Sequence, residues 1–338
     1  MKQNEPNEPP LVSLLIPIYG VENYIEECLH SVLRQTYTPL EIILVDDCSP
    51  DRSVERAKRL IAQENKHNHQ IHLLRHEKNL GIAGARITAL KKAQGELLFF
   101  LDSDDYFLSP YAIEKSVECM LREQADMLIF NYTELFKKSR RRSTLPRIYD
   151  SKELVHALLE GATPAYFWNK VFRRNLFLEK ANFFQLGNNM WEDMQNVVPY
   201  SLSVQRIAYI EESFVAYRRT NERSVTLDPS HKNVTSMKKV IGFLENLFIE
   251  RLGEEQAQTF AASFAAAYHT IDIGVLCNAS YQDFSTLIRN NPELHAHIRR
   301  MPRMSGYFLR WALLCHQLHL TPLSFLVVRS KEFLQKRR

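Results

Sequence analysis

The stretch "LLFFLDSDDYF", residues 97 to 107, joins five apolar residues directly to three carboxylates. A short apolar run of this kind is typical of a strand that is covered on both faces of a sheet. The carboxylates Asp102, Asp104 and Asp105 follow where the run ends. A chain that places this much negative charge at the edge of its core needs a partner for it, so the stretch predicts a buried strand that leads into a polar site.

The residues around this stretch repeat the same pattern. Each apolar run that predicts a strand is followed by a segment with the apolar spacing of a helix. The predicted strands are 11–18, 41–47, 71–75 and 96–102, and the first three predicted helices are 23–35, 52–64 and 82–94. The fourth helix follows in "SPYAIEKSVECML", where Ser109 can cap and Pro110 suits the first helical position. Four strand–helix units in series predict an α/β fold with a parallel sheet and right-handed crossovers.

A second acidic pair, Asp46 and Asp47, ends the strand "EIILVDD". Ligands bind beyond the carboxyl ends of parallel strands, so both acidic clusters are expected at one edge. If residues 102–104 are extended, Asp102 and Asp104 lie on one face. Like charges this close share a proton or a cation, and oxygen ligands favour Mg²⁺ or Mn²⁺ together with phosphates. The alternative is that these aspartates form turns or cap helices.

Composition limits the class of protein. The chain has 338 residues, an apolar fraction of 45% and a charged fraction of 24%, as in ordinary globular proteins. Its net charge of +4 is too small to predict a nucleic-acid partner. The five cysteines form no CxxC pair, and residues 1–10 are polar without an apolar leader. These features predict reduced thiols, a flexible N-terminus and a cytoplasmic location.

Five segments occur in a characteristic order: "VSLLIPIYGVENYIEECLHSVLRQTY", "EIILVDDCSPDRS", "NLGIAGAR", "GELLFFLDSDD" and "WNKVFRRNLF". In this order and spacing they resemble the inverting family-2 glycosyltransferases over residues 11–225. The resemblance implies the GT-A fold, a Rossmann-like, mostly parallel sheet flanked by helices. It also implies a division into residues 1–10, a catalytic domain at 11–228 and a helical C-terminal region at 229–338.

The resemblance implies a nucleotide-diphospho-sugar as donor. Pro17, Ile18 and Tyr19 would surround the nucleobase, with Tyr19 stacking on it. Asp47 would accept the N–H of the base, whereas Asp46 would stabilise the loop or the ribose. An acidic acceptor suits uracil, so a UDP-sugar is expected, and GDP- and dTDP-sugars stay open.

By the same resemblance, Asp102, Asp104 and Asp105 bind the ribose and a divalent cation. Asp104 is the preferred metal ligand and Asp102 the second. The sequence does not decide which of the three contacts the metal directly.

The segment "NLGIAGAR" contributes two glycines and an arginine. Gly81 and Gly84 let the backbone approach the nucleotide closely, and Arg86 could pair with a carboxylate or a phosphate. The family often has Asn after this arginine, whereas this chain has Ile87.

The base is expected in "MWEDMQNV", residues 190–197, where Asp193 follows Glu192. Asp193 would take the proton of the acceptor hydroxyl, and the alternative is that these acids only favour a helix N-terminus. Trp191 could stack on a sugar or simply pack.

Two further segments are assigned near the site. Residues 167–177 are expected to form a buried helix from which Lys170 reaches the site. Tyr217, Arg218 and Ser224 would close over the diphosphate.

The basic run at 137–147, after a strand at 127–136, is expected to be a solvated loop or to contact anionic lipid or a phosphate-bearing acceptor. Residues 306–328 are too interrupted by polar residues for a membrane span. With the basic C-terminus they could form an amphipathic hairpin on the anionic inner face of a membrane. Packing on the catalytic domain or dimerisation would explain them equally well.

The sequence thus predicts a metal-dependent inverting glycosyltransferase that carries a DXD motif and is cytoplasmic and peripheral to the inner membrane. Its acceptor would be a lipid-linked oligosaccharide, a lipopolysaccharide intermediate or a related surface polysaccharide. One alternative is a metal-dependent nucleotidyl or phosphoryl transferase, although GxxxxGK[ST] is absent. Another is a catalytically silent nucleotide-sugar binding module. A dinucleotide oxidoreductase is disfavoured because no GxGxxG follows the first strand.

Overall fold

The computed structural model of the chain describes residues 8–178, 183–184, 190–221 and 231–278. The chain divides into two compact units. The first comprises residues 1–158 and 162–221, and the second comprises residues 159–161 and 222–338. The division after residue 221 lies near the domain boundary that the sequence predicts after residue 228.

The first unit is built on one sheet, which has nine strands in the described residues. The strands are β1 (Val12–Ile18), β2 (Leu40–Asp46), β3 (Gln70–Arg75), β4 (Leu97–Phe100), β5 (Tyr106–Phe107), β6 (Met127–Leu135), β7 (Arg140–Arg142), β8 (Lys170–Arg173) and β9 (Ile207–Arg218). Their spatial order is β3-β2-β1-β4-β8-β6-β9-β5, with β7 paired to β6.

Helices connect these strands. They are α1 (Ile25–Leu33), α2 (Ser53–Glu64), α3 (Gly81–Lys92), α4 (Ala112–Arg122), α5 (Ser151–Leu159), α6 (Asn175–Leu178) and α7 (Glu192–Ser201). The mixed α/β architecture with helices flanking the sheet confirms the fold class that the sequence predicts.

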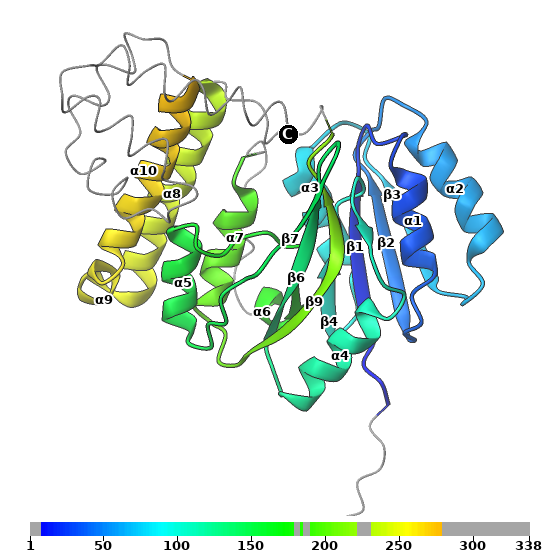
Figure 1. Cartoon of the computed structure of the whole chain (residues 1–338), viewed down its shortest axis with the longest axis horizontal. Helices are drawn as coiled ribbons and strands as arrows, with labels where there is room; N and C mark the ends of the chain where they lie inside the picture. The colour runs from blue at the N-terminus through cyan, green and yellow to red at the C-terminus, as the bar shows by residue number, and fades with distance from the viewer. Residues whose placement is uncertain (1–7, 179–182, 185–189, 222–230, 279–338) are drawn as a thin grey trace, which may run out of the picture. The chain divides into compact units, whose positions relative to one another are not determined.

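The first half of the sheet has the predicted parallel arrangement. Strands β3, β2, β1 and β4 are neighbours, and all three pairings between them are parallel. Figure 1 shows these strands, from blue to cyan, with their connecting helices. The second half is mixed, because β8 pairs antiparallel with both β4 and β6, while β6 and β9 are parallel.

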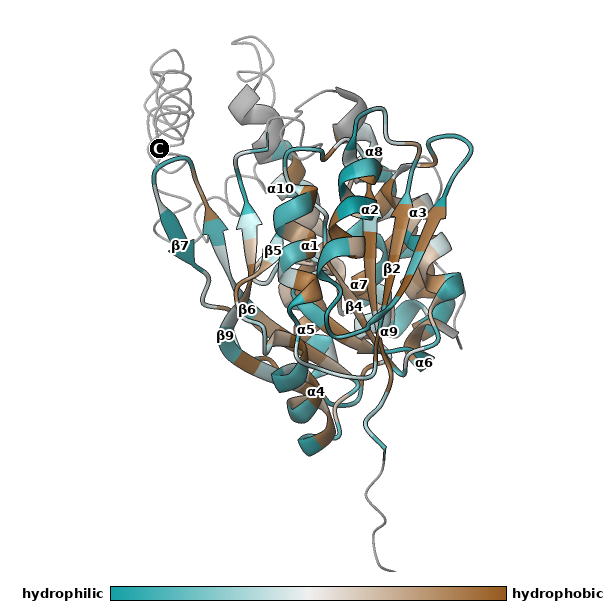
Figure 2. Ribbon diagram, turned by 90° about the vertical axis from the view of Figure 1, so that its right-hand side faces the viewer, coloured by the Kyte–Doolittle hydropathy of each residue, from teal (hydrophilic) through white to brown (hydrophobic). Residues whose placement is uncertain are grey.

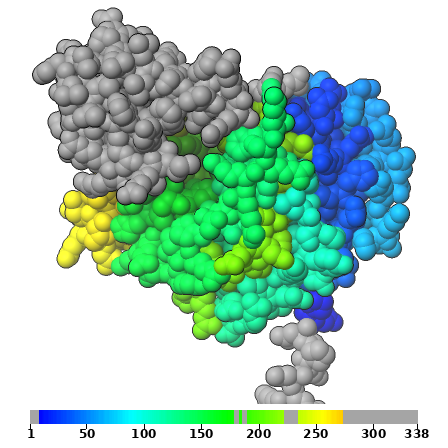
Figure 3. Space-filling view, in the orientation of Figure 1, coloured from blue at the N-terminus to red at the C-terminus, as the bar shows by residue number. Residues whose placement is uncertain are grey.

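The core of this unit lies around β1. Val12, Leu14 and Ile16 on one face of the strand and Leu15 on the other are fully buried, which agrees with a strand covered on both faces. Burying each such side chain contributes about 1.5–3 kcal/mol. In Figure 2 the central strands are mostly brown, whereas β7 is teal. Figure 3 shows the early segments (blue) and the later strands (green) side by side on one face of this unit.

The expectation of a helix at residues 167–177 is wrong. The structure has β8 there, followed by the short helix α6. Val171 pairs with Phe99 of β4 on one side and with Leu128 of β6 on the other. β-Branched and aromatic side chains suit this buried position in a sheet. Pairing with β4 on one side and β6 on the other therefore makes this segment a strand, although its apolar residues have helical spacing.

The fourth helix begins two residues later than predicted. α4 starts at Ala112, and Ser109 does not cap it. Instead, the Ser109 Oγ accepts the backbone N–H of Tyr111 at 3.2 Å, which forms a turn ahead of the helix.

The described part of the second unit is helical, with α8 (His231–Leu252), α9 (Glu254–Gln258) and α10 (Ala261–Asn278). Phe248 of α8 packs against Phe260 and Phe264, with ring centroids 5.0 and 5.2 Å apart. The predicted hairpin at 306–328 lies outside the described residues. Among the helices of the described chain, none combines the length and apolar character that crossing a membrane requires.

Candidate active site

The predicted donor residues lie at one edge of the sheet because the parallel strands end there together. Ile18, the last residue of β1, is in register with Asp46, the last residue of β2. On the other side of β1, Leu15 is in register with Phe100, the last residue of β4. The residues that follow these strands therefore share this carboxyl edge.

The residues after β1 divide into core and surface. Tyr19 is 52% exposed and Ile18 is fully buried, whereas Pro17 is half-buried. Ile18 therefore belongs to the core and offers no surface to a nucleobase. Tyr19 and Pro17 remain available to a ligand at this edge.

The side chain of Asp47 organises the start of α3. Its Oδ1 accepts the backbone N–H of Leu80 and its Oδ2 accepts that of Gly81, both at 2.8 Å. The ring of His76 contacts Oδ1 through Nδ1 at 2.7 Å. Gly81 adopts φ +78°, a conformation that favours glycine. Asp47 thus fixes the loop that carries Gly81, a contact that the sequence did not predict.

Asp46 stabilises its own loop, one of the two roles expected for it. Its Oδ1 accepts the backbone N–H of Ser49 at 2.8 Å, and its Oδ2 lies 3.2 Å from Arg75 Nε.

Residues 102–105 form a turn rather than an extended segment. The backbone N–H of Asp105 donates to the carbonyl oxygen of Asp102 at 2.9 Å. The condition for placing Asp102 and Asp104 on one face of a strand is therefore not met. Because of the turn, the three carboxylates differ in exposure. Asp102 and Asp104 are half-buried, and Asp105 is 1% exposed.

Asp105 is directed into the protein. Its Oδ1 accepts the backbone N–H of Arg218 at 2.7 Å, and burial, together with the nearby charges of Asp104 and Asp102, raises its pKa well above the ordinary value. Asp105 thus joins the turn to the end of β9. This burial argues against direct contact with a nucleotide.

Asp102 and Asp104 fit a divalent cation. Burial raises the pKa of Asp104, and the neighbouring charge of Asp102 raises it further. Two close carboxylates of this kind gain from a shared hard cation. Within the described chain, no group of three or more His, Cys, Asp or Glu side chains is arranged to hold a metal. A cation at Asp102 and Asp104 would therefore need oxygen ligands from elsewhere, as diphosphate provides.

Arg86 is the centre of the site. Its side chain is 1% exposed, and its Nη2 donates to Asp102 Oδ1 at 3.0 Å. Its Nη1 donates to Glu192 Oε1 at 2.9 Å and also to Asp193 Oδ1. Burial alone would lower the pKa of Arg86, but these three carboxylates outweigh burial and raise it. Arg86 therefore pairs with carboxylates, one of the two roles expected for it.

This guanidinium joins two distant motifs. Glu192 and Asp193 begin helix α7, directly after Trp191, which has φ +59°. That conformation is uncommon for a bulky residue and is often found at functional sites. Through Arg86 the acidic start of α7 meets the turn after β4.

The two acids of α7 are shifted toward their protonated forms. Burial raises the pKa of Glu192 to about 8, with a further contribution from Asp193. Burial also raises the pKa of Asp193, whereas the charge of Arg86 opposes this shift. A carboxylate with a raised pKa is better matched to accepting a proton near neutral pH.

Arg218 is held by its own chain. Its Nε donates to the carbonyl oxygen of Asp104 at 2.6 Å, and its Nη2 pairs with Glu27 of α1. The guanidinium also lies over the rings of Tyr24 and Tyr106, 5.3 and 5.1 Å from their centroids. In this arrangement Arg218 braces the turn instead of extending over a diphosphate. Ser224 lies outside the described residues.

Two residues without an assigned role, Asn221 and Phe167, contact the assigned site residues. Asn221 Nδ2 donates to Asp104 Oδ2 at 2.8 Å, and the Arg86 guanidinium carbon lies 5.0 Å from the ring centroid of Phe167. Tyr217 packs against Trp168 with ring centroids 4.9 Å apart. The sequence analysis gave no role to Asn221, which belongs to no motif, or to Phe167, although Phe167 begins the segment 167–177 that it placed near the site.

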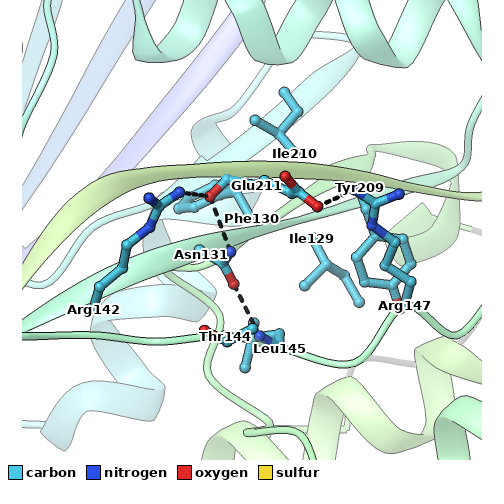
Figure 4. A pocket seen from close by; sticks show the side chains of 10 residues that line it. All are labelled: Ile129, Phe130, Asn131, Arg142, Thr144, Leu145, Arg147, Tyr209, Ile210 and Glu211. Atoms are coloured by element: carbon cyan, nitrogen blue, oxygen red, sulfur yellow. Dashed lines mark hydrogen bonds and ion pairs between the residues drawn. The ribbon is translucent and has the colours of Figure 1, made fainter.

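The basic run forms part of the sheet rather than a free loop. Arg140–Arg142 is strand β7, paired antiparallel with β6. A cavity of about 270 Å³ lies beside it, at an irregularity in the β6–β9 pairing. Figure 4 shows Arg142 and Arg147 both directed at Glu211, and Asn131 bridging Glu211 to Leu145. The residues lining this cavity are separate from those around Arg86.

Comparison with known proteins identifies related sequences. A family model described as Glycosyl transferase family 2 matches residues 13–179. The uncharacterized glycosyltransferase EpsJ of Bacillus subtilis is 34% identical over 234 residues, 65% of this chain and 64% of that protein. The Escherichia coli protein WfgD, a UDP-Glc:alpha-D-GlcNAc-diphosphoundecaprenol beta-1,3-glucosyltransferase, is 38% identical over 122 residues, 36% of this chain and 46% of its own length. This chain therefore covers less than two thirds of either relative.

A similar fold is found in the crystal structure of S. aureus TarS residues 1–349 in complex with UDP-GlcNAc. The TM-score is 0.66 and the sequence identity 19%, with 95% of this chain and 91% of that chain covered. At this identity the likeness concerns the fold.

Proposed function

We propose that the chain, whose residues 13–179 match the model of glycosyl transferase family 2, is a member of that family and transfers one sugar, with inversion, from a nucleotide-diphospho-sugar to an acceptor hydroxyl. The observation that carries this proposal is the placement of Arg86 between Asp102 and Asp193. A single buried guanidinium thereby brings a donor-side carboxylate and a candidate base into one site.

The donor would lie along the carboxyl edge. Tyr19, which is 52% exposed, would stack on the base beside Pro17. Asp47 is 2% exposed and its oxygens accept the N–H groups of Leu80 and Gly81, so it would act by fixing the loop and not by contacting the base. Gly81 has no side chain to obstruct phosphates that lie beside the start of α3, where the N–H groups of Leu80 and Gly81 are already bound by Asp47. UDP is our first choice of nucleotide.

Asp102 and Asp104 would hold an Mg²⁺ or Mn²⁺ ion together with the donor diphosphate. Such a cation would neutralise charge on the leaving diphosphate. The half-buried position of both carboxylates and their mutual repulsion support this role.

Asp193 would act as the general base. The acceptor oxygen forms a bond to the anomeric carbon, its proton passes to Asp193, and the bond from that carbon to the diphosphate oxygen breaks. The electron pair of the broken bond leaves with the nucleoside diphosphate. Attack from the face opposite the leaving group inverts the anomeric centre. Arg86 would keep Asp193 oriented, because its Nη1 already binds Asp193 Oδ1.

We further propose a lipid-linked or surface-glycan acceptor. The name of WfgD describes a diphosphoundecaprenol-linked acceptor for that protein, and this supports the same class here. A peripheral position on the cytoplasmic face of a membrane rests on the sequence of residues 306–338 alone.

The test is Asp193→Asn, compared with the wild type across UDP-, GDP- and dTDP-sugars with Mn²⁺. Loss of a general base should lower kcat by about 10²–10⁴-fold while leaving the donor dissociation constant unchanged. The matched control is Asp126→Asn, which alters an aspartate that binds the backbone of Gln205 and Arg206. Equal turnover by wild type and Asp193→Asn would contradict the base assignment, and donor binding without any turnover would support a silent binding module.

A further inference from the structure

The end of β9 and the residues that follow it hold the turn after β4 at three points. The backbone N–H of Arg218 donates to Asp105 Oδ1 at 2.7 Å, and Arg218 Nε donates to the carbonyl oxygen of Asp104 at 2.6 Å. The third contact comes from Asn221, whose Nδ2 donates to Asp104 Oδ2 at 2.8 Å. Of these three contacts, the last is the one that reaches a carboxylate assigned to the cation.

The backbone that leads to Asn221 is anchored to the sheet. Arg218, the last residue of β9, is in register with Leu135 of β6, and the N–H of Arg219 donates to the carbonyl oxygen of Leu135 at 2.9 Å. Asn221 follows two residues later and is 9% exposed. Its amide therefore approaches Asp104 from a fixed strand end and is shielded from solvent.

Lys170 provides a contrast among the buried polar side chains. Its Nζ donates to the carbonyl oxygens of Pro164 and Tyr166, both at 2.8 Å, and to Asn169 Oδ1 at 2.9 Å. These neutral acceptors bind Lys170 within the fold, whereas the amide of Asn221 is bound to a carboxylate of the proposed site.

The two carboxylates assigned to the cation are held in the same way. Asn221 engages Oδ2 of Asp104, and Arg86 Nη2 engages Oδ1 of Asp102 at 3.0 Å. A hydrogen bond to one oxygen fixes the orientation of a ligating carboxylate. Each carboxylate would then bind a cation through one oxygen more readily than through both.

Binding through single oxygens distinguishes between cations. Mg²⁺ requires close to octahedral geometry, and it is bound by one or two carboxylates together with waters and phosphates. Ca²⁺ takes six to eight oxygens in flexible geometry and accepts carboxylates that bind through both oxygens. An amide that engages one oxygen of Asp104 therefore favours the smaller cation.

We infer that Asn221 is a positioning residue for Asp104: its amide engages Oδ2, leaves the other oxygen for the cation of the donor, and thereby favours Mg²⁺ or Mn²⁺ over Ca²⁺. This inference rests on the proposed cation at Asp102 and Asp104. Asn221 acts through Asp104 and is not itself a ligand of the cation.

The test measures cation binding and does not depend on turnover. Mn²⁺ is titrated into the protein saturated with UDP and followed by the EPR signal of free Mn²⁺, with UDP alone as the blank, and Ca²⁺ is measured by competition. Asn221→Ala should weaken Mn²⁺ binding about 10–100-fold and Ca²⁺ binding by a smaller factor. Asn221→Leu, which is close to asparagine in size but has no donor, should do the same. Calorimetry in EDTA should show that both variants bind UDP as tightly as the wild type.

The matched control is Asn65→Ala. The side chain of Asn65 both donates to and accepts from the backbone of His69, at 3.0 Å in each case, in the loop between α2 and β3. This variant also removes an asparagine side chain that binds another part of the chain. It should leave the Mn²⁺ and Ca²⁺ affinities unchanged.

The outcomes separate this inference from the proposed function. Mn²⁺ binding that is unchanged in both Asn221 variants, while Mn²⁺ still strengthens UDP binding to the wild type, would overturn the role of Asn221 alone. Equal losses of Mn²⁺ and Ca²⁺ affinity, or weaker UDP binding in EDTA, would show a purely structural role and would also overturn it. A wild type that binds UDP equally well with Mn²⁺ and EDTA would overturn the proposed cation and this inference together.

Discussion

Both edges of the sheet hold buried carboxylates, and they stabilise them differently. At the amino edge, Glu41 is fully buried and accepts hydrogen bonds from the Ser13 hydroxyl and from the backbone N–H groups of Gln94 and Gly95, at 2.6 and 3.0 Å for the two backbone donors. At the carboxyl edge, three carboxylates share the guanidinium of Arg86.

This difference distinguishes a carboxylate that serves the fold from carboxylates that are available to a ligand. Neutral donors hold Oε1 of Glu41, whereas its Oε2 has no hydrogen-bond partner among the described residues and lies 3.8 Å from His72 Nε2. Full burial leaves Glu41 no surface for a ligand. At the carboxyl edge the negative charges outnumber the cation that pairs with them, and Asp102 and Asp193 stay half-buried. A partly open cluster whose charges are incompletely neutralised can gain from binding a cation or a proton, whereas a fully buried carboxylate such as Glu41 is closed to a ligand.

The largest effect is expected for Arg86→Met. Removing the shared cation leaves three carboxylates unpaired, which should cost about 3–5 kcal/mol of unfolding free energy and abolish donor turnover. Urea unfolding and a donor hydrolysis assay measure the two effects. Arg122→Met, at an exposed arginine that pairs with Glu123, is the control and should cost less than about 1 kcal/mol. Similar losses for both variants would contradict the central role of Arg86.

At the amino edge, Gly95→Ala should destabilise the protein without changing the site. A Cβ at Gly95 would lie 2.5 Å from Ser13 N and 2.8 Å from the Leu11 carbonyl oxygen. Overpacking against backbone costs about 1–3 kcal/mol, and sometimes more. Gly242→Ala, in helix α8 with its nearest neighbour at 3.8 Å, should instead stabilise by about 0.5–1 kcal/mol. Weaker UDP binding by folded Gly95→Ala would show that the two edges are coupled.

Tyr19→Ala should weaken nucleotide binding with little effect on stability. Stacking of a base on an aromatic ring contributes about 1–3 kcal/mol, so the dissociation constant of UDP should rise about 5–150-fold. Tyr111→Ala is a close control, because Tyr111 is 51% exposed and Tyr19 is 52% exposed. Calorimetric titration of UDP with Mn²⁺ compares the two, and equal affinity would remove Tyr19 from the donor site.

A further effect concerns pH. The pKa of Glu192 is raised to about 8, so between its ordinary pKa and pH 8 the folded state holds a proton that the unfolded state has lost. The stability contributed by this proton is present at low pH and disappears as pH rises through 8. Glu192→Gln has no such proton to lose, so its unfolding free energy should not decline in this way. The unfolding free energy of the variant minus that of the wild type should therefore increase from pH 5 to pH 8.5. Urea unfolding at both values tests this, with exposed Glu212→Gln as a control that should show no such trend.

The sequence predicted the features that depend on local pattern. Apolar runs followed by helical spacing indicated the strands β1 to β4, and the position of Asp46 and Asp102 after two of these strands indicated a shared edge. These inferences succeed because strand and helix periods can be read within about ten residues.

Features that depend on distant residues could not be read in this way. Arg86 meets Glu192 and Asp193 across 106 and 107 residues, and Asn221 reaches Asp104 across 117. β8 is a strand because of the space between β4 and β6, which no local pattern records. The extended conformation expected at 102–104 is replaced by a turn, and the turn directs Asp105 to the backbone of Arg218.

The most direct test of the carboxyl edge as a donor site is calorimetric titration of UDP into the wild type and Asp104→Asn, each with Mn²⁺ and with EDTA. The account predicts that Mn²⁺ strengthens UDP binding to the wild type by roughly tenfold or more, equivalent to about 1.4 kcal/mol, and that Asp104→Asn loses this gain. Asp126→Asn should behave as the wild type. UDP affinity that is the same with Mn²⁺ and EDTA, or a metal effect that survives in Asp104→Asn, would contradict it.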